Sequence, residues 1–158
     1  MKKNPCKAQI LSRQRKFRIL PRSVSSFCGR ILQTLGQKDC SLSVVFINSR
    51  RMREINRIYR GKNVATDVLS FRYAGETFEG KPFLGEIVIS PEVAQKNAAE
   101  GRMAFDAEIR TLVLHGILHL IGYDHETDDG EMNRLQKSLQ RRRVFLDSTP
   151  MAYAKGGR

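Results

Sequence analysis

Residues 115–125 read His-Gly-Ile-Leu-His-Leu-Ile-Gly-Tyr-Asp-His and contain all three histidines of this 158-residue chain. His115 and His119 are one helical turn apart in an apolar run that predicts a helix, so their imidazoles should lie on the same face. Gly122 can adopt the left-handed conformation that ends helices, which allows the chain to turn back and bring His125 to the same place. The spacing therefore predicts a metal site whose ligands are His115, His119 and His125.

Three neutral imidazoles leave a zinc-like ion one position for water, which is typical of catalytic rather than structural sites. The alternative is that the histidines are hydrogen-bonded residues of the core. The spacing also matches the H-x-x-x-H-x-x-G-x-x-H frame of the metzincin metallopeptidases, but the glutamate that follows the first histidine in those enzymes is Gly116 here. Because position 116 offers no general base, a zinc metallopeptidase is the weaker interpretation.

Other stretches complete a resemblance to the YbeY family of bacterial rRNA maturation factors, which are metal-dependent single-strand endoribonucleases. They are residues 56–60 (Asn-Arg-Ile-Tyr-Arg), 66–71 (Thr-Asp-Val-Leu-Ser-Phe) and 84–90 (Leu-Gly-Glu-Ile-Val-Ile-Ser). Residues 115–125 match the family's H-G-x-L-H-L-x-G-Y-D-H signature throughout. The sequence departs from the family at Val64-Ala65, where a Lys-Pro pair is frequent, and at Arg72, where a proline is common.

The resemblance implies which residues carry the reaction and what they bind. Arg60 lies where the family has its functional arginine, beside the metal cleft, so Arg60 and His115 are the expected catalytic residues. The alternative for Arg60 is a structural ion pair with Asp67 or Glu86. The expected cofactor is one divalent metal ion, Zn²⁺ in the first instance.

The resemblance further implies a single-strand-specific, metal-dependent endoribonuclease that acts in 16S rRNA 3′ end maturation and in ribosome quality control. The expected partners are single-stranded RNA, rRNA in particular, and the small ribosomal subunit, with no DNA and no membrane. A second interpretation, from another class, is a non-catalytic RNA-binding ribosome assembly factor with a structural metal. A fourth protein ligand, such as Asp124, would favour that alternative.

The composition favours a polyanionic partner in the cytoplasm. The chain has 28 Lys and Arg against 16 Asp and Glu, a formal net charge of +12, and phosphate contacts with such residues dominate nucleic-acid affinity. The alternative is that the charge serves only solubility. No apolar segment of signal-peptide length follows the N-terminus. Three cysteines without a C-x-x-C pair, Cys6, Cys28 and Cys40, predict free thiols in a reducing compartment and no metal role.

Strand and helix patterns alternate in the first half of the chain, and helices dominate later. This order predicts one α+β domain with a small mixed sheet covered by helices and a central metal-bearing helix that is apolar nearly all round. The resemblance implies the same architecture with about four strands. The predicted strands are 8–11, 42–47, 68–71 and 85–89, and the predicted helices are 21–35, 49–60, 91–100, 106–121 and one that begins at Thr127.

Two expectations concern the edges of this domain. In the helix that Asn48 should cap, the apolar residues Met52, Ile55, Ile58 and Tyr59 are expected to face inward, with arginines outward. The domain is expected to span residues 1–147, and the Pro, Gly and basic composition of residues 148–158 predicts a frayed basic tail.

Overall fold

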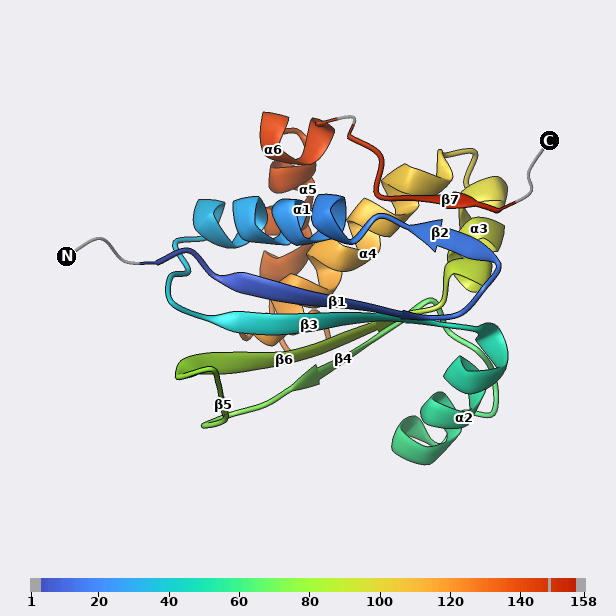
Figure 1. The fold of residues 1–158 in the computed structure, drawn as a ribbon, viewed down its shortest axis with the longest axis horizontal. Coiled ribbons are helices and arrows are strands. Elements are labelled where there is room, and N and C mark those ends of the chain that lie inside the picture. Colours follow the sequence, from blue (N-terminus) through green and yellow to red (C-terminus); the bar gives the residue numbers. More distant parts are fainter. Residues whose placement is uncertain (1–3, 148, 156–158) are drawn as a thin grey trace.

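A computed structural model describes residues 4–147 and 149–155. Its centre is a mixed sheet with strand order β1-β3-β6-β4, in which the short β5 also pairs with β6 (Figure 1). β1 and β6 are parallel to β3, whereas β4 is antiparallel to β6. The strands are β1 (Lys7–Arg13), β3 (Ser41–Ile47), β4 (Val68–Arg72), β5 (Thr77–Phe78) and β6 (Lys81–Ile89). The prediction of an α+β domain with a small mixed sheet is confirmed.

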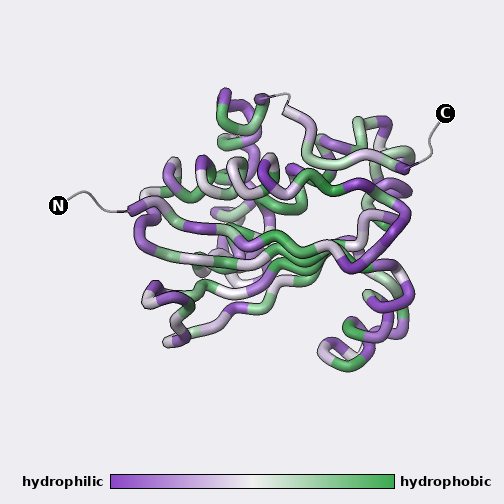
Figure 2. Tube along the Cα trace, viewed as in Figure 1, coloured by the Kyte–Doolittle hydropathy of each residue, from purple (hydrophilic) through white to green (hydrophobic). Residues whose placement is uncertain are grey.

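Helices cover both faces of this sheet: α1 and α4 lie over one face and α2 lies over the other (Figure 1). Alternate residues of β3 reach the two sides, because Val44 and Phe46 belong to the main core, while Val45 and Ile47 belong to a smaller cluster with α2. Figure 2 shows the apolar segments of the central strands lying side by side between these layers. The helices are α1 (Pro21–Thr34), α2 (Ser49–Arg60), α3 (Pro91–Glu100), α4 (Phe105–Leu120), α5 (Glu131–Gln140) and α6 (Arg143–Leu146). No helix within the described ranges is both long and apolar enough to cross a membrane.

The central helix is α4, as predicted, and eight of its residues are buried. It lies close to β6 because Gly116 has no side chain. A Cβ atom at position 116 would lie only 2.7 Å from Cγ2 of Ile87, well inside the optimal separation of two carbon atoms. The contact brings the helix backbone down onto the sheet, and it fixes which side of α4 faces away from β6.

The inward face of α2 was predicted only in part. Asn48 caps the helix by accepting a hydrogen bond from the Arg51 N–H (2.8 Å), and Met52 is fully buried. Ile58 and Tyr59, however, are 61% and 68% exposed. The inward placement of Ile58 was wrong, whereas the Tyr59 ring does face the sheet, because it packs against Phe71 of β4 (ring centroids 5.1 Å). The buried cluster under α2 includes residues of its first two turns only, and the last turn meets the sheet at β4 through the exposed Tyr59 ring.

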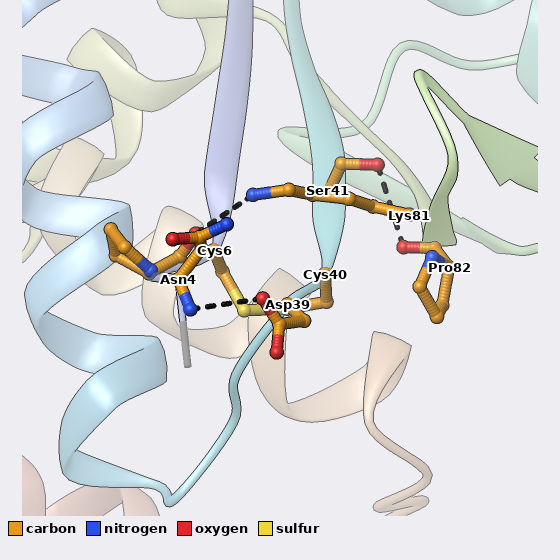
Figure 3. The surroundings of a disulfide bond; sticks show 8 residues. Asn4, Cys6, Asp39, Cys40, Ser41, Lys81 and Pro82 are labelled. Atoms are coloured by element: carbon orange, nitrogen blue, oxygen red, sulfur yellow. Dashed lines mark hydrogen bonds between the residues drawn. A yellow bond between two sulfur atoms is a disulfide. The ribbon is translucent and has the colours of Figure 1, made fainter. Parts of the chain in front are cut away.

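The prediction of three free thiols was wrong for two of them. Cys6 and Cys40 form a disulfide (Figure 3). Only Cys28 is free, and it is buried in the core. The cause is strand register: β1 and β3 are parallel neighbours with Lys7 opposite Ser41, so the residue before each strand faces the other. A C-x-x-C spacing is not needed when a sheet brings distant residues together.

The C-terminal segment packs on the domain, so a frayed tail was the wrong prediction there. β7 (Ala152–Ala154) pairs antiparallel with β2 (Phe17–Ile19). Met151 is only 1% exposed, and its N–H donates to Oδ1 of Asp106 in the first turn of α4 (2.6 Å). The tail positions 148 and 156–158 lie outside the described residues.

The helix expected from Thr127 begins later, as α5 at Glu131. The two carboxylate oxygens of Asp128 accept hydrogen bonds from the N–H groups of Gly130 (2.8 Å) and Met132 (2.9 Å). These bonds satisfy donors at the start of the helix in place of a cap at Thr127.

Candidate metal and active site

The histidine triad is assembled by the turn that ends α4. Gly122 has a φ of +110°. Its N–H donates to the His119 carbonyl (3.1 Å), and the next N–H, of Tyr123, donates to the Leu118 carbonyl (3.0 Å). These two bonds are those of a Schellman motif, which satisfies the last carbonyls of a helix. The turn carries His125 back to the two helical histidines, as the sequence predicted.

The three imidazoles are close enough to hold one ion. Their candidate ligand nitrogens all lie within 4.8 Å of one another, and Nε2 of His115 is 3.1 Å from Nε2 of His119. Asp124 is not part of this group, and its Oδ1 accepts the Glu126 N–H (3.0 Å). Three protein ligands with an open position are the arrangement of catalytic metal sites.

His115 is oriented by a residue of α5. Its Nδ1 lies 3.1 Å from Oε1 of Gln136. Because an amide oxygen can only accept, this contact favours the tautomer with the proton on Nδ1 and leaves the Nε2 lone pair for an ion. Gln136 was missed by the sequence analysis. The sequence feature that could have revealed Gln136 is its place on the same helical face as the inward residues Met132 and Leu139, where a polar side chain is unexpected.

The protonation state of His119 also suits a metal. Burial lowers the pKa of His119, and the neighbouring His115 and His125 lower it further. A lowered pKa keeps the imidazole neutral near neutral pH, which is the form that binds metal ions. The donor set therefore fits a divalent ion that prefers nitrogen ligands, such as zinc.

The triad opens into a cavity of about 370 Å³. One wall is the turn after α4. A second wall is β4, which contributes Val68, Ser70 and Arg72. Arg60, the last residue of α2, lines a third side. The structure thus brings together all four residues that the sequence assigned to the site, Arg60 from α2 and the three histidines from residues 115–125.

Arg60 is exposed at this cavity and does not form the ion pairs considered as its alternative role. The ion pairs among the described residues involve Lys16, Arg30, Arg51 and Arg110. Asp67 instead accepts from Nδ2 of Asn97 (3.2 Å), and Glu86 accepts from the Tyr73 hydroxyl (3.4 Å). The Arg60 guanidinium is therefore available to an anion in the cavity.

Position 116 cannot supply a peptidase base. Gly116 faces β6, where an added Cβ would meet three side-chain atoms of Ile87 within 2.8 Å. A glutamate there would be directed into the sheet and not into the cavity. The geometry thus agrees with the sequence argument against a metallopeptidase.

Comparison with known proteins identifies the family. The sequence model described as Endoribonuclease YbeY matches residues 9–143. The chain belongs to the YbeY endoribonuclease family. The YbeY endoribonuclease of Thermodesulfovibrio yellowstonii is 37% identical over 147 residues, which cover 84% of this chain and 92% of the relative. The YbeY endoribonuclease of Geobacter metallireducens is 38% identical over 141 residues, which cover 88% and 93%.

A solved structure extends the YbeY likeness to the fold. The solution structure of a protein from Thermotoga maritima aligns with a TM-score of 0.57 at 29% sequence identity, covering 83% of this chain and 85% of that one. The family prediction is confirmed, and the matches span the site as well as the sheet.

Proposed function

We propose that this YbeY family member hydrolyses phosphodiester bonds of single-stranded rRNA. The proposed task is 3′ end maturation of 16S rRNA and ribosome quality control, on the small ribosomal subunit in the cytoplasm. One observation carries the proposal: three metal-competent histidines converge on one cavity with an arginine that has no carboxylate partner in the described part of the chain. The relatives' activity as endoribonucleases and the net charge of +12 support RNA as the substrate.

In this proposal the three histidines would bind the metal ion and Arg60 would bind the phosphate. A divalent ion on His115, His119 and His125, with Zn²⁺ as the proposed ion, would supply a Lewis acid and lower the pKa of a bound water. His115 serves catalysis as a ligand whose orientation is set by Gln136. Arg60 would hold oxygens of the scissile phosphate with its planar guanidinium and stabilise the negative charge that develops there.

The test is cleavage of a labelled rRNA precursor by three variants. Arg60→Ala should keep its fold and its metal but cleave about 10²-fold more slowly, the scale of losing one donor to a developing oxyanion. Arg60→Lys should recover only part of the rate, because an ammonium cannot copy the two-pronged contact. Arg57→Ala is the matched control, since Arg57 is an exposed arginine of the same last turn outside the cavity.

The same assay separates the alternatives. A chelator should abolish cleavage, elemental analysis should identify the bound ion, and a duplex form of the substrate should resist. RNA binding without cleavage by the metal-loaded protein would support the non-catalytic assembly factor instead. Cleavage of casein would support the peptidase.

A further inference from the structure

Arg72 is a second arginine of the cavity, placed there by strand geometry. Successive residues of a strand face opposite sides. In β4, Leu69 and Phe71 belong to the cluster under α2, whereas Val68, Ser70 and Arg72 line the cavity. The backbone of Arg72 pairs with Gly85 of β6, so its Cα is held by the sheet and its side chain leaves on the side of the triad.

The Arg72 guanidinium lies against the turn that positions the metal ligands. A Cβ atom built on Gly122 would be 3.4 Å from Nη1 and 3.6 Å from Nη2 of Arg72. Gly122 lies midway along the chain between His119 and His125. The positive charge of Arg72 is therefore placed at the rim of the metal cleft and not on a remote surface.

Arg72 has no carboxylate within ion-pair distance among the described residues, because the ion pairs found there use Lys16, Arg30, Arg51 and Arg110. Its neighbour Tyr73 engages Glu86 on the opposite face of the sheet. Asp124 and Glu126 also line the cavity, and Asp124 already accepts a backbone N–H. An exposed guanidinium held beside a cleft without a paired acid is suited to bind a phosphate.

We propose that Arg72 binds a backbone phosphate of the RNA next to the phosphate held by Arg60, so that the RNA chain crosses the cavity from the end of α2 to the end of β4. This inference rests on the proposed function, because it takes RNA as the substrate. Arg72 would bind the substrate without acting on the bond that breaks. It should therefore affect KM and RNA affinity, whereas Arg60 should affect kcat.

The test measures binding separately from cleavage. A fluorescein-labelled single-stranded RNA is titrated with chelator-treated protein, and anisotropy is followed at several salt concentrations. Arg72→Gln should weaken binding by about tenfold, the loss expected for one charged hydrogen-bond contact. It should also reduce the slope of log K against log salt by about 0.7, the value for one phosphate of a single strand. Arg72→Lys should keep the slope and part of the affinity.

Arg57→Gln is the matched control, because it removes the same charge outside the cavity. In steady-state cleavage by metal-loaded protein, Arg72→Gln should raise KM and leave kcat nearly unchanged. If Arg72→Gln has the slope and affinity of the Arg57→Gln control while Arg60→Ala still loses cleavage, the inference is overturned and the proposed function stands. If the wild type binds RNA in an Arg72-dependent way but does not cleave it, the proposed function fails and the binding role of Arg72 is retained.

Discussion

The close packing of Gly116 on β6 predicts that Gly116→Ala destabilises the protein although alanine favours helices. The new methyl group would lie 2.7 Å from Cγ2 of Ile87 and 2.8 Å from its Cγ1 and Cδ1. Ile87 is fully buried, so it cannot swing into solvent. Overpacking of this kind costs about 1–3 kcal/mol, and alanine regains about 1 kcal/mol over glycine in a helix. Because Cγ1 and Cγ2 branch from one carbon and cannot both rotate away, we expect a net loss of about 1–2 kcal/mol.

A second substitution tests the cause of this loss. Ile87→Ala removes all three contacting atoms and should itself cost about 2–5 kcal/mol. In that background Gly116→Ala should stabilise the protein by about 1 kcal/mol, because only the helix preference remains. The assay is urea unfolding followed by circular dichroism, with chelator present so that metal binding does not contribute. If Gly116→Ala had the same effect in both backgrounds, or stabilised the otherwise unchanged protein, the packing argument would be refuted.

Three further predictions concern the metal, the disulfide and pH. The protein should bind about one divalent ion per chain, and His119→Ala should lose it by elemental analysis; full occupancy in that variant would contradict the triad. Reduction of the Cys6–Cys40 bond, whose sequence separation is 34, should lower the unfolding free energy by about 4 kcal/mol on the loop-entropy estimate. Equal urea midpoints for oxidised and reduced protein would show that the bond does not constrain the chain. Burial raises the pKa of Glu108 above its ordinary value of 4.5, so the folded state binds this proton more tightly than the unfolded state does. Its stabilising contribution is then complete below pH 4.5 and is lost as the pH rises through the folded-state value. Glu108→Gln should raise the melting temperature at neutral pH but leave it nearly unchanged below pH 4.5. The control Glu100→Gln, at an exposed position, should not raise the melting temperature at neutral pH.

The site was predictable where its chemistry is local in sequence. The interval between His115 and His119 follows from the helical period alone, and Gly122 ends α4 with the left-handed residue that such an end requires. Most of the strands of the main sheet were predictable for a similar reason, because their apolar and β-branched runs are continuous. The role proposed for Arg60 came from the family resemblance, and no local pattern distinguishes it from the other arginines of α2.

The errors fall where the outcome depends on partners that are distant in the chain. Cys6 meets Cys40 through the register of two parallel strands, and a rule based on the spacing of cysteines in the sequence cannot predict that register. Tyr59 follows the helical period and packs against Phe71 of β4, yet it stays 68% exposed, because the helical period does not say how much of a side chain the sheet will cover. β7 forms by pairing with the backbone of β2, and amino-acid composition alone cannot predict that pairing. Gln136 reaches His115 across the interface of two helices.

The position of β4 at the margin of the sheet has a consequence for colloidal behaviour. β1 and β4 are the two outer strands, so within the described part of the chain each has one row of backbone donors and acceptors that no neighbouring strand uses, and such rows can recruit a strand of another molecule. Both outer strands carry cationic residues: Lys7 and Arg13 begin and end β1, and Arg72 ends β4. Repulsion between these charges opposes edge-to-edge association, so Arg72, assigned above to RNA binding, would also help to keep the molecules apart when no RNA is bound. Salt screens both effects, and light scattering by RNA-free protein should rise over the same salt range that releases RNA; scattering that stays flat there would assign solubility to other features of the surface.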